Sequence, residues 1–144
     1  MARADFYILP QADERSRFTF ICRVCEKALE QGLKVYIYTR DPAQAEYLDR
    51  FMWAYREDSF LPHHRIGDTP SAPISIGWGE LVPDHRSLFI NAADQLIELA
   101  FEFDRIAEIV VQDQNLLDAS RQNYVRCRDL GYELNRVDMR QRQT

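Results

Sequence analysis

The pattern of apolar and polar positions along the 144-residue chain predicts strands and helices that alternate. The stretch from Leu33 to Thr39 is β-branched and aromatic and almost without charge, which is typical of a strand buried on both faces. A helix is predicted to begin directly after it. There Asp41 can cap free backbone N–H groups, Pro42 suits the first helical position, and Gln44 completes a capping box.

The same periodicities predict the other elements of the chain. Glycines at positions 32 and 131 are expected to end two of the helices in a left-handed conformation. Residues 94–103 fit either a short helix or a strand, and residues 64–73 are expected to form a polar loop. Strands are predicted at 4–9, 33–39, 74–78, 87–91, 106–111 and 132–137, and helices at 13–31, 41–55 and 116–130.

This alternation favours parallel pairing of the strands with right-handed crossovers. We therefore expect a single α/β domain over residues 1–144, with a mostly parallel central sheet flanked by helices and a flexible tail at 138–144. In nucleotide-binding versions of such a fold, the turn after the strand carries glycines that leave room for phosphate. Here that turn carries Thr39, Arg40 and Asp41, so the fold resembles a nucleotide-binding domain without its phosphate loop.

Composition and charge narrow the range of functions. Hydrophobic residues make up 46% of the chain and charged residues 28%, which are ordinary values for one globular domain, and the formal net charge is −5. This charge balance is unsuited to holding a long nucleic-acid backbone. With no wide basic track in the sequence, direct binding of single-stranded DNA through the C-terminal arginines is disfavoured as a main role. Six arginines and three acidic residues follow position 120, so the C-terminal segment is basic and suited to a small anionic partner.

The sequence predicts a cytoplasmic protein. Three cysteines, an odd number without framework spacing, indicate a reducing compartment. No apolar run approaches the ~20 residues of a membrane helix, so no membrane partner is expected. Acidic and polar residues interrupt the N-terminal stretch where a signal peptide would be apolar.

No residue pattern predicts a catalytic or metal site, and no cofactor is expected. Cys22 and Cys25 form a C-x-x-C pattern in the middle of a predicted helix, where two small apolar side chains on a buried face explain them better than redox or zinc chemistry. The adjacent His63 and His64 lack the spacing of metal ligands and are interpreted as surface or packing residues. The carboxylates between positions 98 and 108 are interpreted as a solvated face. The sequence contains neither a glycine-rich phosphate loop nor a nucleophile elbow.

Two surface features remain. The first is an aromatic segment at the end of the second predicted helix, and it has two interpretations. Its side chains either cap the core or anchor a protein interface, because aromatic residues on a short loop are typical anchors. The segment contains Trp53, Phe60, Leu61, Pro62 and His63.

The second feature is one face of the last predicted helix, where arginines recur at helical spacing around a tyrosine. This face is either a solvated arginine stripe or a groove in which guanidinium groups hold carboxylates around an apolar floor. The interleaved apolar side chains favour the groove, which would suit an acidic peptide or a C-terminal carboxylate. Its residues are Arg121, Tyr124, Val125, Arg128, Gly131 and Tyr132.

Four stretches together resemble the chi subunit of bacterial DNA polymerase III holoenzyme, in order and over essentially the whole chain. The most specific are the run through S-F-L-P-H and the R-x-x-Y-x-x-x-R-x-x-G-aromatic run. The four are ADFYIL at 4–9, GLKVYIYT at 32–39, QAEYLDRFMWAYREDSFLPH at 44–63 and RQNYVRCRDLGYELNRVDM at 121–139.

This resemblance implies a non-catalytic accessory subunit of the replicative DNA polymerase. The family pairs with the psi subunit, which ties it to the clamp loader. It also binds the acidic, Phe-ended C-terminal tail of single-stranded DNA-binding protein, so it contacts DNA only indirectly. By position, the resemblance assigns psi binding to Trp53, Phe60, Leu61, Pro62 and His63, and tail binding to Arg121, Tyr124, Val125, Arg128, Gly131 and Tyr132.

Two departures and two alternatives accompany the resemblance. Leu117 and Val125 stand where the family often has lysines, which predicts a weaker and less salt-sensitive tail interaction. A helicase could share the Phe60 surface. From the fold alone, the alternative function is a nucleotide-binding or hydrolytic enzyme, which the missing glycine loop disfavours.

Overall fold

The computed structural model describes residues 2–55, 61–68 and 72–140. Within them, seven strands form one sheet in the order β3-β4-β2-β5-β6-β1-β7, and every pairing is parallel. This confirms the predicted α/β fold. The strands are β1 (Arg3–Ile8), β2 (Val35–Thr39), β3 (His63–Arg65), β4 (Ile74–Trp78), β5 (Leu88–Asn91), β6 (Arg105–Val110) and β7 (Glu133–Asp138), and the helices are α1 (Glu14–Glu30), α2 (Pro42–Trp53), the 3-10 helix η1 (Glu98–Glu102) and α3 (Gln114–Asp129).

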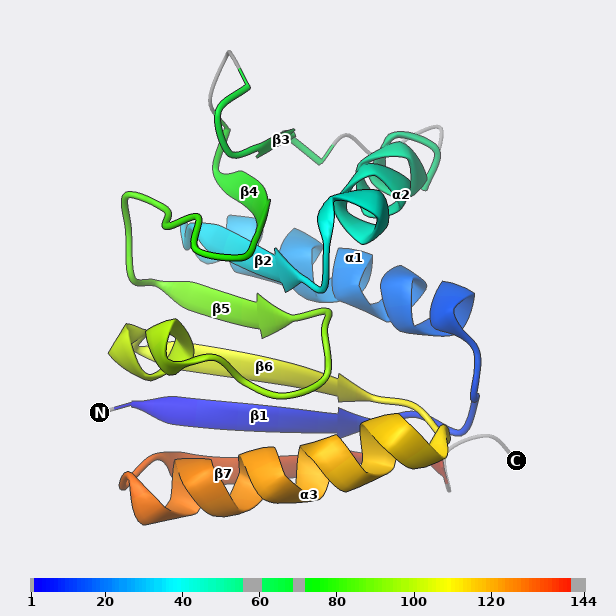
Figure 1. The fold of residues 1–144 in the computed structure, drawn as a ribbon, viewed down its shortest axis with the longest axis vertical. Coiled ribbons are helices and arrows are strands. Elements are labelled where there is room, and N and C mark those ends of the chain that lie inside the picture. The colour runs from blue at the N-terminus through cyan, green and yellow to red at the C-terminus, as the bar shows by residue number, and fades with distance from the viewer. Residues whose placement is uncertain (1, 56–60, 69–71, 141–144) are drawn as a thin grey trace.

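Helices cover both faces of the sheet. α1 leads from β1 to β2 and α2 leads from β2 to β3, in one direction across the sheet, so right-handed crossovers place both on the same face. α3 leads from β6 to β7 in the opposite direction and lies on the other face, in front of β1 and β7 in Figure 1. One buried cluster therefore fills the space under α1 and α2, and a second lies under α3 and η1.

The central strand β2 is buried on both faces, as its composition predicts. It lies between β4 and β5, and Val35, Tyr36 and Ile37 have no exposed surface. Successive side chains of a strand point to opposite faces. Accordingly, Ile37 packs into the cluster under α1 and α2, whereas Tyr36 packs into the cluster under α3.

The ends of the helices follow the predicted capping chemistry, with one difference. The Asp41 carboxylate accepts a hydrogen bond from the Gln44 N–H group and begins α2. The Gln44 side chain accepts from the N–H group of Arg40 (2.7 Å), one residue before the partner that a capping box predicts. Gly32 and Gly131 have φ angles of 73° and 84°, the left-handed conformation expected after α1 and α3.

One strand departs from the sequence prediction. The expected loop at 64–73 is wrong at its start, because His63–Arg65 forms β3 and pairs with β4. This edge strand consists of three polar residues without the alternation of a half-buried strand, so the sequence alone does not predict that it pairs with β4. The segment that the sequence left open, 94–103, contains the 3-10 helix Glu98–Glu102.

The cysteine pair lies where the sequence predicts it, on the buried face of α1. Burial raises the pKa of Cys22 to about 12 and the pKa of Cys25 well above its ordinary value, so both remain thiols. Within the described residues, no three His, Cys, Asp or Glu side chains come together as a metal site. No helix in this part of the chain has the length and apolar character needed to cross a membrane.

β7 forms one edge of the sheet and carries the pairing beyond the expected start of the tail. The N–H group of Met139 donates to the carbonyl of Ile8 (2.8 Å), one residue after Asp138 ends the strand. Residues 141–144 of the expected tail lie outside the described residues. Because Arg136 lies opposite Phe6 in the register, its side chain is directed to the face that α3 covers.

Candidate functional site

A groove of about 430 Å³ lies between α3 and the sheet, beside β1 and β7. We call it the α3 groove. Its cations come from three segments: Arg121 from α3, Arg136 from β7 and Arg140 from the residues after β7. Its apolar floor consists of Phe6, Ile8, Val110, Leu117, Tyr124 and Val125.

The floor is an apolar surface that remains open beside the core. Phe6 is buried, and the ring of Tyr124 packs against it edge-on, with the ring centroids 5.2 Å apart. Val125 is 41% exposed, although the helix around it is otherwise anchored on the sheet. Covering this floor with an apolar side chain would remove further apolar surface from water, which is favourable by roughly 25 cal/mol per Å².

The three arginines of the groove differ in whether their guanidinium groups already pair with a carboxylate of this chain. Arg140 makes an ion pair with Asp138 (2.7 Å), and its hydrogen bonds lower the pKa of that carboxyl to about 2. Arg121 lies 3.2 Å from Asp118 at an exposed position, where an ion pair is weak. Arg136 has no carboxylate within ion-pair distance among the described residues. An incoming carboxylate would therefore meet Arg136 without displacing a partner.

The structure brings three of the six predicted tail-site residues into this groove: Arg121, Tyr124 and Val125. Arg128 does not line it. Its guanidinium is exposed and pairs with the carboxylate of the next residue, Asp129 (3.1 Å).

The last two predicted residues lie beyond the end of α3. Gly131 makes the turn that ends the helix. The Tyr132 ring is buried, and its hydroxyl donates to the carbonyl of Phe103 (2.9 Å), so this side chain belongs to the core under η1. Both residues fix the end of α3 and do not line the groove.

From the sequence, Arg136 and Arg140 enter only the charge balance of the C-terminal segment. Strand periodicity alone could have shown that Arg136 shares a face of β7 with every second residue of that strand. Placing Arg136 in the groove also requires knowing that β7 pairs with β1, on the face of Phe6 and Ile8, and periodicity does not show which strand is the neighbour. Both positions that lack the family's lysines, Leu117 and Val125, line the groove and make its floor more apolar.

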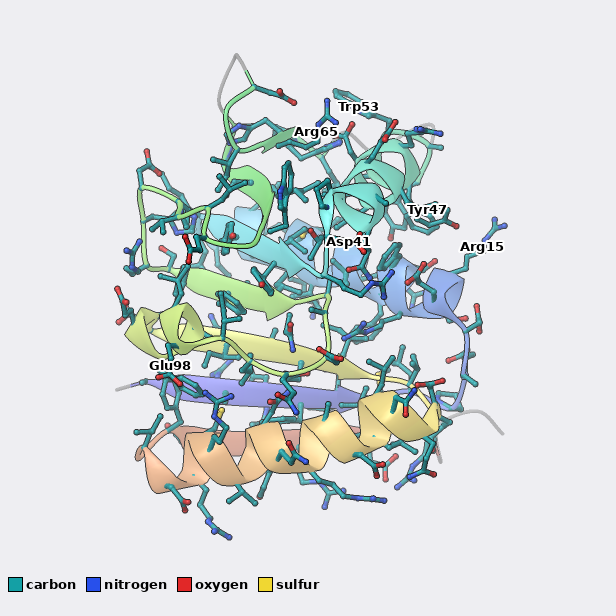
Figure 2. All side chains as sticks on the ribbon, in the orientation of Figure 1. Arg15, Asp41, Tyr47, Trp53, Arg65 and Glu98 are labelled. Atoms are coloured by element: carbon teal, nitrogen blue, oxygen red, sulfur yellow. The ribbon has the colours of Figure 1, made fainter. Side chains whose placement is uncertain are left out.

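The aromatic segment at the end of α2 is exposed at some residues and buried at others. Trp53 is 58% exposed, and Figure 2 shows it at the outer end of α2. Its ring lies 4.5 Å from that of His63, measured between centroids. His63 is itself buried and contacts the Leu61 carbonyl (2.6 Å) and the Asp49 carboxylate (3.3 Å).

These contacts divide the predicted psi-binding residues. Trp53 is more than half exposed and Pro62 is half-buried. Leu61 is buried in the core under α1 and α2, and the buried His63 contacts both its carbonyl and the Trp53 ring. Phe60 lies outside the described residues.

A buried arginine lies at the carboxyl ends of β5 and β6, where α/β folds usually bind ligands, and connects the two strand ends through hydrogen bonds. Arg17 of α1 is 4% exposed. Its guanidinium donates to four carbonyls, those of Asn91, Ala92, Ala93 and Ile109, at 2.7–3.1 Å.

A buried carboxylate lies beside Arg17 at a position where the sequence predicts a solvated one. The prediction that the carboxylates between positions 98 and 108 form a solvated face is wrong for Glu108, which is 2% exposed. Its Oε1 accepts hydrogen bonds from the side-chain amides of Asn91 and Asn123 (both 2.8 Å). Both amides also donate to the Asp94 carbonyl, so the cluster joins β5, β6 and α3 to the loop after β5. Burial raises the pKa of Glu108 to about 7.

Comparison of the sequence with known proteins identifies the family of this chain. A sequence model of the family described as "DNA polymerase III chi subunit, HolC" matches residues 1–135. The chain belongs to this family. The chi subunit of Pseudomonas aeruginosa is 37% identical over 134 residues, covering 93% of this chain and 94% of that protein. The chi subunit of Escherichia coli is 28% identical over 142 residues, covering 94% of this chain and 97% of that protein.

The chi fold is also similar to a solved structure outside the family. The crystal structure of T4 UvsW superimposes with a TM-score of 0.64 at 9% identity, covering 96% of this chain and 42% of that one. At this identity the likeness shows the fold alone. Chi is a replication accessory subunit of DNA polymerase III, so membership of its family supplies the functional setting for the two surfaces described above.

Proposed function

We propose that this chi-family subunit is a non-catalytic adaptor in the bacterial cytoplasm, which joins the clamp loader to single-stranded DNA-binding protein during replication. The α3 groove is the proposed site for the acidic, Phe-ended tail of that protein. The observation that carries the proposal is the combination, in one groove, of an apolar floor with three arginines from three different segments.

The groove fits the chemistry of such a tail. Its terminal Phe ring would pack on Tyr124 and Leu117, where aromatic and aliphatic side chains are already exposed to the groove. Its carboxylates would meet Arg121 and Arg136, whose planar guanidinium groups can each hold a carboxylate with two hydrogen bonds. This arrangement uses Arg136, which the family resemblance does not assign, and leaves Arg128 outside.

The first prediction concerns tail binding. Replacing Arg121 or Arg136 by alanine should weaken binding of a fluorescein-labelled tail peptide about tenfold, equivalent to about 1.4 kcal/mol, because each removes a carboxylate partner. Replacing Arg128 by alanine should change it less than about threefold. Fluorescence anisotropy titration measures all three.

Arg128→Ala is the matched control, since it removes the same charge from the same helix outside the groove. If Arg128→Ala weakens binding as much as Arg121→Ala while Arg136→Ala has no effect, the tail lies further toward the end of α3. Wild-type affinity in both Arg121→Ala and Arg136→Ala would reject the groove as the tail site.

For the psi subunit, we propose the Trp53 surface. A tryptophan that is more than half exposed, and is held from beneath by a buried histidine, resembles the anchors that dominate protein interfaces. A helicase partner could use the same anchor. Arg17 is in keeping with the non-catalytic part of the proposal, because its guanidinium, at the strand ends where α/β enzymes usually bind their ligands, is engaged with backbone carbonyls.

The second prediction concerns this anchor. Trp53→Ala should weaken binding of purified psi subunit about 30-fold, which corresponds to about 2 kcal/mol, the usual threshold of an interface hot spot. Tyr47→Ala provides the control, because Tyr47 is also an exposed aromatic residue of α2 but packs against Phe18 and Phe51. Isothermal titration calorimetry gives both affinities. Equal effects of the two substitutions would remove Trp53 from this role.

A further inference from the structure

A second hollowed surface lies on the face of the sheet opposite the α3 groove, between α1 and strands β1 and β6. It consists of two adjoining hollows of about 410 and 270 Å³ that share Phe20, Arg23 and Met139. We call it the α1 trough. β1 and β7 therefore separate two recesses: the α3 groove on one face and the α1 trough on the other.

The trough is basic although the protein as a whole is acidic. Its larger hollow is lined by Arg3, Arg23, Lys27 and Arg105, against one carboxylate, that of Asp5. Asp5 is already engaged, because its buried carboxylate pairs with Arg3 (3.1 Å) and Arg105 (3.6 Å).

In contrast to Arg3 and Arg105, the cations that α1 contributes to the trough are not engaged in ion pairs with described residues. Neither Arg23 nor Lys27 makes an ion pair with any of the described residues. Both are exposed, and Arg15 lines the far hollow with its side chain extended into solvent in Figure 2. The one other carboxylate placed on this face by the strand register is that of Glu133, which lies opposite Arg3. Cations therefore outnumber anions along the trough.

The cations of α1 are distributed along the two adjoining hollows. Arg23 and Lys27 are four residues apart on α1, which is about 6 Å along the helix axis, and Arg15 lies about 12 Å before Arg23. Between them the floor contains two half-buried aromatic rings, Tyr7 and Phe20, with centroids 5.1 Å apart. Aromatic surfaces within a positively charged groove are the features by which proteins bind single-stranded nucleic acid.

We propose that the α1 trough binds single-stranded DNA. This goes beyond the proposed adaptor function, in which contact with DNA is only indirect. The alternative occupant, an acidic peptide, fits the trough less well than it fits the α3 groove. There three arginines surround an apolar floor that can bury a terminal side chain, whereas in the trough the cations are spread along an extended surface. Such a contact would hold the polymerase complex on the template strand without single-stranded DNA-binding protein as an intermediary.

The test is a fluorescence anisotropy titration with a labelled oligothymidylate of about 20 nucleotides, using the full-length protein at low salt. Wild type should bind saturably, and the logarithm of its association constant should fall with the logarithm of salt concentration with a slope of about −2 to −3, as expected for three or four neutralised phosphates. The double substitution Arg23→Glu and Lys27→Glu should weaken binding at least tenfold.

A matched control separates the trough from general charge effects. Arg50→Glu with Arg128→Glu changes the net charge by the same amount at exposed residues that line neither recess, and it should alter DNA binding less than twofold. Circular dichroism checks that both double variants are folded. Equal loss of binding in the two variants would overturn the inference, as would the absence of DNA binding by wild type.

Titrating the tail peptide with the same variants keeps this inference distinct from the proposed function. We expect Arg23→Glu with Lys27→Glu to bind the tail peptide like wild type. If that variant loses the peptide and keeps the DNA, the trough is a peptide site and the inference is wrong. If Arg121→Ala alone loses the peptide, the adaptor proposal stands whether or not DNA binds.

Discussion

Replacing Glu108 by glutamine is expected to raise the free energy of unfolding by about 2 to 3 kcal/mol more at pH 8.5 than at pH 5. Glu108 is 2% exposed and accepts hydrogen bonds from Asn91 and Asn123. Burial disfavours its ionised form and raises its pKa from 4.5 to about 7. Glutamine keeps the acceptor oxygen for the two amides and removes the charge.

The sign of the effect follows from the protons that each state binds. Below about pH 4.5 Glu108 is protonated in both the folded and unfolded states, and it imposes no cost. Between about pH 4.5 and pH 7 the unfolded chain releases its proton while the folded protein keeps it, so the stability of wild type falls as pH rises. Above about pH 7 the folded protein contains a buried carboxylate and the full cost is present. The glutamine variant avoids this loss.

Urea unfolding followed by far-UV circular dichroism, at several pH values between about 5 and 8.5, measures the difference. Glu102→Gln is the control, because Glu102 is an exposed carboxylate in the segment before β6 and pairs with Arg86 on the surface. Its variant should follow the wild-type pH profile. A glutamine variant at position 108 whose profile also stays parallel to wild type would show that Glu108 is ionised in the folded protein throughout this range.

Replacing Arg17 by methionine is expected to lower the free energy of unfolding by about 3 to 5 kcal/mol. Methionine fills part of the same volume but leaves four buried carbonyls without the guanidinium that joins them. Each lost hydrogen bond to a charged donor costs about 1.5–3 kcal/mol, and the methionine packing offsets part of the sum. Arg17→Lys should recover less than half of the loss, because a single ammonium group cannot reach carbonyls on two strands at once.

Arg15→Met is the matched control for this substitution. Arg15 lies two residues earlier on α1 and its side chain extends into solvent in Figure 2, so its loss should change stability by less than about 0.5 kcal/mol. Chemical unfolding at neutral pH compares the three variants with wild type. If Arg17→Met unfolds within about 1 kcal/mol of wild type, the carbonyls at the ends of β5 and β6 do not depend on this arginine.

The local features of the fold could be predicted because they depend on residues close together in the chain. The buried run before Thr39, the caps at Asp41 and the glycines after α1 and α3 all follow from periodicity or backbone preference. β3 escaped prediction because its three polar residues form a strand only by pairing with β4. The same limit affected Glu108, whose burial depends on β5 and α3 on either side of it.

The candidate site shows the same division. Arg121 and Tyr124 could be found from helical spacing, because both come from one helix. Arg136 joins them only because parallel pairing places β7 beside β1, under α3. Arg128 has the correct spacing along the helix, but it lies beyond the end of the groove.

The sequence by itself determined the alternating α/β elements, the buried cysteine pair and the resemblance to the chi family, because these depend on local periodicity or on residue order. The tertiary structure alone decided which cations share a surface. The basic residues of the α1 trough come from positions as distant as Arg3 and Arg105, so no stretch of sequence appears basic there. Parallel pairing of β1 with β6, covered by α1, brings these charges together, and charge complementarity depends on distance in space rather than on separation along the chain.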